Sequence, residues 1–162
     1  MRHKSLESDE CAVARSLDAI GDWWSILIVR DAMTGKRRFG EFQKSLGLAK
    51  NILTVRLRKL VAESILRLEP ASDGSAYQEY VLTEKGEGLY VVVTALWQWG
   101  ANSLFADGEL KRAIIDRSTG KRLPPLEVKA ADGRVLGPRD IQLTQADQIV
   151  MRDSRPPGSP PA

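Results

Sequence analysis

Residues 39–60 read FGEFQKSLGLAKNILTVRLRKL, and this stretch decides the fold. Apolar side chains recur at helical spacing on both sides of a break at residues 47–49, where a glycine favours a turn. The apolar series consists of Phe39, Phe42 and Leu46 before the break and of Leu53, Leu57 and Leu60 after it, with Ile52 and Val61 beside the second set. The pattern predicts a helix, a tight turn and a second helix.

The second predicted helix carries polar side chains on the face opposite its leucines. A helix with an apolar back and a cationic, hydrogen-bonding front fits the major groove of B-DNA, where side chains near its N-terminus reach base edges. The pattern therefore predicts a DNA-reading helix over residues 50–64. Its outward stripe consists of Asn51, Thr54, Val55 and Arg58, and its flanks carry Lys50, Arg56 and Lys59.

Positive charge is concentrated around this helix. Between residues 36 and 67 there are nine basic and two acidic residues, a local charge of +7 against +3 for the whole chain. Such a concentration is typical of a phosphate-binding surface. On charge alone, a solvated basic helix in another kind of bundle is the alternative. The basic residues are Lys36, Arg37, Arg38, Lys44, Lys50, Arg56, Arg58, Lys59 and Arg67.

The composition excludes several functional classes. The 162 residues are 43% hydrophobic and 28% charged, which is ordinary for one globular domain with or without a small appendage. One cysteine, Cys11, and one histidine, His3, cannot build a disulfide framework or a cysteine metal cluster, so no metal and no cofactor are predicted. Neither a phosphate-cradling glycine loop nor a nucleophile–base pair is present, so the chain is not expected to be an enzyme. Without a signal-peptide core or an apolar run of ~20 residues, we expect a cytoplasmic protein and no membrane partner.

The segments on either side of the quoted stretch complete a small domain. Residues 11–20 predict a short amphipathic helix, and residues 23–33 predict an apolar helix, capped by Asp22, at the centre of the core. Residues 65–69 and 77–82 predict two strands.

A two-stranded hairpin directly after a DNA-reading helix is the wing of a winged helix. Asp73-Gly74 is the strongest turn signal between the two predicted strands. Because this wing tip carries Asp73 and no basic residue, we expect it to contribute little to DNA affinity.

A last predicted helix starts after the cap residue Thr83 and is apolar over residues 89–105, which read LYVVVTALWQWGANSLF. One small core cannot hide so much apolar surface, so the pattern favours a dimer interface. A two-fold dimer would also present two reading helices to successive turns of the major groove. The alternative is that the C-terminal appendage covers this helix.

The C-terminal third changes character. Strands are predicted at residues 113–116 and 126–129, with turns at 118–120 and 131–133, and together they indicate two hairpins. The predicted fold class is α+β and mainly helical. It comprises a flexible N-terminal tail at 1–10, a winged helix domain at 11–106, a small β-rich appendage at 107–153 and a disordered tail at 154–162.

The motifs resemble those of the HxlR family of bacterial winged helix-turn-helix regulators over roughly residues 11–105. They are C-x-V-A-R-x-L-D-x-I-G at 11–21, W-S-I-L-I at 24–28, R-F-x-E-F at 38–42, L-T-x-R-L-x-x-L at 53–60, Y-x-L-T-x-x-G at 80–86 and W-G at 99–100. The resemblance implies a DNA-binding transcription regulator that works as a homodimer, paired through its first and last helices. It also implies that Arg38, Arg56 and Arg58 contact the DNA backbone or bases.

The chain departs from the family pattern in two places. The family often starts the recognition helix with Ser-Pro, whereas this chain has Ala49-Lys50, which removes an N-cap hydroxyl worth ~1 kcal/mol and adds a cation. C-terminal extensions of some relatives carry paired cysteines that suggest zinc, and this chain has none there.

Two features suggest a signal that the regulator senses. Cys11 lies where redox-sensing relatives carry a reactive thiol; the helix N-terminus favours the thiolate, whereas Asp9 and Glu10 oppose it. A cysteine that only packs at the dimer interface is the alternative. Trp24 and Trp97, with Trp23 and Trp99 nearby in sequence, are candidates for an aromatic effector pocket, and the alternative is that they belong to the core.

For the whole protein, the alternative function is a winged-helix adaptor that binds proteins without sequence-specific DNA binding.

Overall fold

The computed structural model describes residue 6 and residues 8–144. The chain divides into two compact units, one that ends at Ile114 and one that begins at Ile115. The tail predicted at residues 154–162, and most of the tail predicted at residues 1–10, lie outside the described residues.

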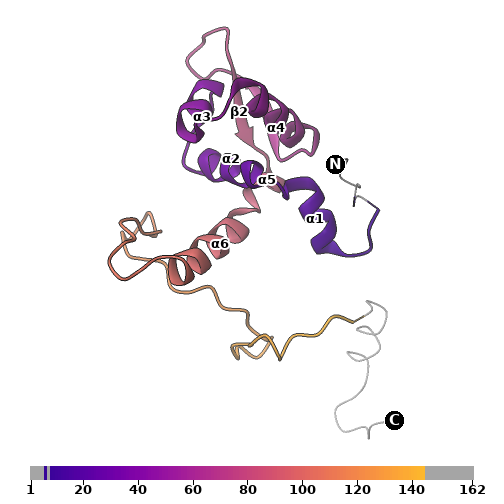
Figure 1. Ribbon diagram of the computed structural model, residues 1–162, viewed down its shortest axis with the longest axis vertical. Helices are drawn as coiled ribbons and strands as arrows, with labels where there is room; N and C mark the ends of the chain where they lie inside the picture. Colours follow the sequence, from indigo (N-terminus) through magenta and orange to yellow (C-terminus); the bar gives the residue numbers. More distant parts are fainter. Residues whose placement is uncertain (1–5, 7, 145–162) are drawn as a thin grey trace, which may run out of the picture. The chain divides into compact units, whose positions relative to one another are not determined.

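The described part of the first unit is mainly helical, with one antiparallel pair of strands (Figure 1). Helix α2 contacts α3, α4, α6 and strand β2, so it is the central element of the unit. This is the predicted winged-helix class. The elements in chain order are α1 (Ala12–Ile20), α2 (Trp23–Met33), α3 (Phe39–Leu46), α4 (Lys50–Ala62), β1 (Leu66–Pro70), β2 (Gln78–Leu82), α5 (Glu84–Glu87) and α6 (Tyr90–Ser103).

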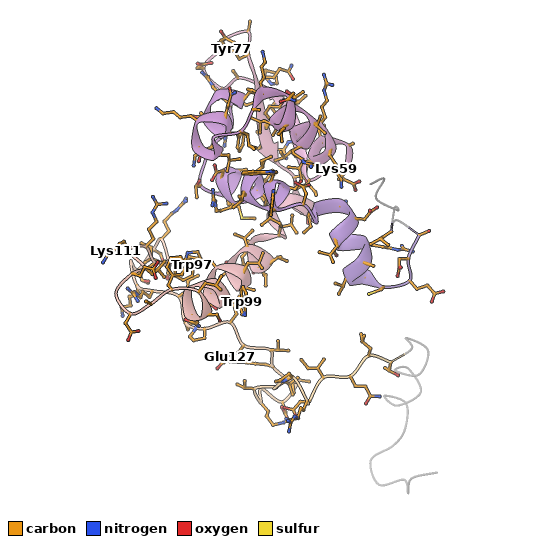
Figure 2. All side chains as sticks on the ribbon, viewed as in Figure 1. Lys59, Tyr77, Trp97, Trp99, Lys111 and Glu127 are labelled. Atoms are coloured by element: carbon orange, nitrogen blue, oxygen red, sulfur yellow. The ribbon has the colours of Figure 1, made fainter. Side chains whose placement is uncertain are left out.

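The hairpin of β1 and β2 is the predicted wing, with each strand starting one residue later than expected. Its register runs from the pair Leu66–Leu82 to the pair Pro70–Gln78. The turn contains Gly74 with φ of +74°, a left-handed conformation that glycine adopts without steric cost. Tyr77 lies exposed at the far end of the hairpin (Figure 2).

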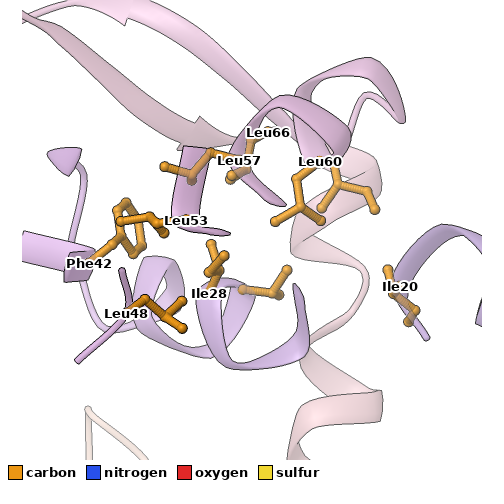
Figure 3. Close-up of a cluster of buried hydrophobic side chains, with 10 residues drawn as sticks. Ile20, Ile28, Phe42, Leu48, Leu53, Leu57, Leu60 and Leu66 are labelled. Carbon is orange, nitrogen blue, oxygen red and sulfur yellow. The ribbon is translucent and has the colours of Figure 1, made fainter. Parts of the chain in front are cut away.

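The core joins α2, α3, α4 and the start of the wing (Figure 3). Phe42 from α3 and the three leucines predicted to face inward from α4 are fully buried. The ring of Phe42 meets that of Tyr80 edge-on at 6.4 Å, so α3 packs directly on the wing. The fully buried apolar side chains are Ile28, Val29, Phe42, Leu53, Leu57 and Leu60, with Ile65 and Leu66 only 1% exposed.

The last predicted helix is broken in two. The Thr83 hydroxyl accepts a hydrogen bond from the Gly86 N–H at 3.1 Å, which confirms the predicted cap, but α5 ends at Glu87 and α6 begins at Tyr90. A Cβ at Gly86 would lie 2.2 Å from the Ile65 carbonyl oxygen, so only glycine allows this close approach. Helix α4 likewise ends at Ala62, before Ser64, whose φ of +55° is left-handed.

Helices α1 and α6 expose most of their apolar side chains, and no residue of α6 is buried. Trp97 and Trp99 both lie on α6 (Figure 2). Exposed apolar side chains such as these are typical of interaction surfaces. This α1/α6 apolar surface consists of Val13 and Leu17 on α1 and of Tyr90, Val91, Val92, Leu96 and Trp99 on α6.

The described part of the second unit, residues 115–144, forms the two predicted turns but not the predicted strands. Isolated bridges join Ile115 to Arg122 and Lys129 to Val135. A turn depends on local chemistry, here glycines with positive φ at 120 and 133, whereas a strand needs a partner and a buried face. No residue from 115 to 144 is buried, so a strand in this segment would have no buried face.

Asp116 organises the first of these turns. Its carboxylate accepts hydrogen bonds from the Ser118 hydroxyl and N–H and from the Thr119 hydroxyl, and these lower its pKa to about 2.

Within the described residues, no helix has both the length and the apolar character of a bilayer span.

Candidate nucleic-acid interface

Helices α3 and α4 are joined by the predicted tight turn. Gly47 closes α3 with φ of +65°, and its N–H donates to the Gln43 carbonyl oxygen at 2.9 Å. Leu48 then turns into the core, which fixes the direction in which α4 leaves the turn. Ala49 precedes α4 and provides no side-chain cap, as its identity predicts.

The outward face of α4 presents a mixed polar and apolar surface. Asn51, Val55 and Arg58 are exposed, and Val55 is 57% exposed although it is apolar. The Thr54 hydroxyl donates to the Lys50 carbonyl oxygen at 2.7 Å, so it is turned back onto the helix. A surface depression on this face is lined by Asn51, Ile52, Val55 and Arg56.

Two of the predicted flanking cations have partners inside the unit. Arg56 Nε lies 3.2 Å from the Asp22 Oδ1, and Asp22 also caps α2 by accepting from the Ser25 N–H at 3.0 Å. The Lys59 ammonium donates to the Asp18 carbonyl oxygen at the end of α1. These contacts fasten α4 to α1 and α2 and leave Arg56 and Lys59 only partly exposed.

Arg38 also has partners that the sequence did not reveal. Its Nη2 lies 2.6 Å from the Asp73 Oδ2 at the wing tip, and its Nε lies 3.4 Å from the Glu79 Oε1 on β2. The hydrogen bond to Asp73, followed by the weaker one to Glu79, raises the pKa of Arg38, and the same bond lowers the pKa of Asp73. Both carboxylates belong to the wing, so Arg38 connects the wing to the start of α3.

Glu41 holds the N-terminus of α3. Its Oε2 accepts from the Arg37 and Arg38 backbone N–H groups, each at 2.8 Å. These bonds lower the pKa of Glu41, with the Arg38 N–H as the larger cause. The identity and spacing of Glu41, the third residue of α3, match the known signal for this contact.

The candidate signal-sensing residues lie at different places in the first unit. Cys11 is exposed and free at the N-cap of α1, and its N–H donates to the Asp9 Oδ1 at 2.8 Å. Trp24 packs against the core and meets Trp23 edge-on at 6.2 Å, whereas Trp97 is half-buried on α6.

Curated relatives of the chain are named as transcriptional regulators. It is 39% identical over 89 residues to an uncharacterised HTH-type transcriptional regulator of Mycobacterium tuberculosis (strain H37Rv), across 55% of this chain and 56% of that protein. It is 33% identical over 94 residues to the HTH-type regulator YybR of Bacillus subtilis (strain 168), across 57% of this chain and 75% of that one. The chain thus spans little more than half the length of the mycobacterial relative.

Solved structures share the fold. PA1607, described as a candidate transcription factor, is 48% identical with a TM-score of 0.84, across 88% of this chain and 99% of its own. The redox regulator HypR in its oxidised form is 32% identical with a TM-score of 0.54, across 59% of this chain and all of its own. The family model for HxlR-like helix-turn-helix proteins matches residues 19–107, more than half of the chain. The chain therefore belongs to the HxlR-like helix-turn-helix family, and the curated relatives that it matches are named as transcriptional regulators.

Proposed function

We propose that this regulator works in the cytoplasm and binds operator DNA as a homodimer, with the α4 helix of each copy in the major groove. The observation that carries the proposal is the exposed, cationic and hydrogen-bonding face of α4. Within the described residues, neither Lys50 nor Arg58 forms an ion pair, so both are available to an anionic partner. Asn51 and Arg58 are suited to base edges, Lys50 to phosphate, and the exposed Val55 to a thymine methyl group.

The remaining predicted DNA contacts are already engaged inside the protein. Arg56 and Lys59 hold α4 against α1 and α2, so their first effect on DNA binding is to orient that helix. Thr54 is turned onto the helix backbone and would meet DNA only through its methyl group. Arg38 is paired with Asp73 and Glu79 of the wing.

The homodimer rests on the α1/α6 apolar surface. Helix α6 has 14 residues and none of them is buried, so most of its apolar side chains would stay in water unless a partner covers them. A second copy supplies an identical apolar surface, and a two-fold dimer would place its two α4 helices on half-sites ~34 Å apart.

Salt dependence of DNA binding tests the proposal. The measurement is fluorescence anisotropy with the duplex upstream of the protein's own gene and with a shuffled duplex, at ~50 and ~200 mM salt. With 6–10 phosphate contacts, affinity should fall by ~10³–10⁵-fold between these concentrations. Equal, salt-insensitive binding to both duplexes would instead favour the protein-interaction adaptor.

Replacing Arg58 with alanine should cost ~1–3 kcal/mol of binding free energy on the upstream duplex, because a bidentate contact to guanine would be lost. The matched control is Arg117→Ala, which removes an exposed arginine of the second unit. Binding to the shuffled duplex should weaken much less than binding to the upstream duplex. If both duplexes lose the same affinity, Arg58 contacts phosphate and does not read a base.

Cys11 is the favoured signal input, because the chain resembles a protein named as a redox regulator and because this thiol is exposed. Diamide would remove the two thiol hydrogens of two Cys11 side chains and leave an intersubunit disulfide. We expect oxidation to yield a covalent dimer on a non-reducing gel and to change DNA affinity. Cys11→Ser should abolish both effects; a persistent change in affinity would exclude the thiol as the sensor.

The effector pocket at Trp24 and Trp97 stays a prediction.

A further inference from the structure

The wing tip carries a negative charge, which is unfavourable in an element that lies near DNA. The charge belongs to the exposed carboxylate of Asp73, which lies in the turn between β1 and β2. Phosphates would repel a free carboxylate at this place, yet Asp73 is neutralised by the Arg38 guanidinium at 2.6 Å. The wing therefore pairs its own negative charge with a cation from the start of α3.

The two carboxylates around Arg38 differ in how firmly they are held. The Glu79 side chain is 6% exposed, and its oxygens also lie 3.7 Å from Arg37 Nη1 and 3.3 Å from the Ser72 hydroxyl. The Asp73 side chain is 51% exposed, and besides Arg38 it accepts from the Ser75 N–H at 3.1 Å, a bond within its own turn. Glu79 is thus the buried partner of Arg38, at the longer distance of 3.4 Å, whereas Asp73 makes the shorter contact from a side chain that faces solvent.

Backbone hydrogen bonds hold the main chain at Arg38 independently of Asp73. The Arg38 backbone N–H is bound by Glu41, and the adjacent Arg37 carbonyl oxygen accepts from the Tyr80 N–H of β2 at 2.8 Å. The guanidinium is 38% exposed and has several N–H donors. It can therefore keep Glu79 Oε1, which lies 3.4 Å from Nε and 3.5 Å from Nη2, and offer the second Nη2 hydrogen to an incoming oxyanion.

We propose that the Asp73 carboxylate occupies, on Arg38, the place that a DNA phosphate takes in the complex. The wing tip then acts as an intramolecular competitor that lowers affinity for all duplexes and leaves the selection of sequence to α4. This inference rests on the proposed DNA-binding function and deepens it.

Asp73→Asn tests the competition, because asparagine keeps the shape and the turn hydrogen bond and removes the charge. An exposed ion pair of this kind opposes an incoming phosphate only modestly, so we expect affinity to rise about twofold to fivefold per half-site on both the upstream and the shuffled duplex. Arg38→Ala should lower affinity and make the slope of log affinity against log salt shallower by about 0.9 per half-site.

The double variant separates competition from general charge. In the Arg38→Ala background, Asp73→Asn relieves only the repulsion between a free carboxylate and the phosphates, so the gain in affinity should be smaller than in the wild-type background, because the cation over which carboxylate and phosphate compete is gone. The matched control is Glu87→Gln, the same loss of charge on the exposed surface of α5. Thermal melting of each variant establishes that it is folded before binding is compared.

The outcomes are distinct. A gain in affinity from Asp73→Asn that is larger with Arg38 than without it supports the exchange, whereas no gain, or an equal gain with and without Arg38, overturns it while the wild-type protein still binds DNA. Wild-type protein that shows no salt-sensitive binding to either duplex overturns the proposed function and the exchange together.

Discussion

Replacing Phe42 with alanine is expected to lower the free energy of unfolding by about 3–5 kcal/mol. The side chain is fully buried between α3, α4 and the wing, and its ring meets Tyr80 edge-on. The substitution removes the transfer free energy of the ring and leaves a cavity that the backbone of three elements cannot close. Chemical denaturation followed by tryptophan fluorescence measures the change, since Trp24 packs against the same core.

Tyr77→Ala is the matched control. It truncates an aromatic side chain of the wing that is 71% exposed, so it should alter the free energy of unfolding by less than about 1 kcal/mol. Both variants are compared with wild type at one protein concentration, because a dimer's stability depends on concentration. A loss below 1 kcal/mol for Phe42→Ala would mean that α3 is not fixed to the core as described.

The sequence predicted the elements whose signals are local. The apolar spacing in residues 39–60 identified the inward side of α4, and Leu53, Leu57 and Leu60 are all fully buried. Asp22 and Thr83 could be predicted as N-caps because the capping hydrogen bond joins residues only three positions apart in the sequence. Turns at Gly47 and Gly74 were equally local, since each needs a positive φ.

The partners of the cations were not predictable in the same way. Arg56 meets Asp22, and Arg38 meets Glu79 and Asp73, across distances in sequence that only the packing of helices and wing determines. Glu79 proves to be buried, which is rare for a carboxylate unless it is paired, and its partners are Arg37 and Arg38. In the second unit, the two turns were predicted correctly, whereas the strands were not. A sequence pattern can predict a turn, but it cannot supply the buried face that a strand needs.

Replacing Leu96 with glutamate is expected to dissociate the proposed homodimer. Leu96 is 49% exposed on α6 and belongs to the α1/α6 apolar surface, so the monomer should stay folded. Two copies would bring two buried carboxylates into an apolar interface, at a cost of several kcal/mol that the interface cannot offset. Light scattering coupled to size exclusion should report a mass that falls to the 17.9 kDa of one chain.

Dissociation should also reduce DNA affinity far more than any single contact on α4. A dimer binds its second half-site at the high effective concentration set by the first, so the monomer should bind ~10²–10⁴-fold more weakly. Leu68→Glu is the control for mass, because Leu68 is exposed to a similar extent on the wing, away from α1 and α6. If Leu96→Glu remains dimeric, a different surface joins the copies. If wild-type protein is itself monomeric yet binds DNA tightly, α6 serves another partner and the half-site argument is wrong.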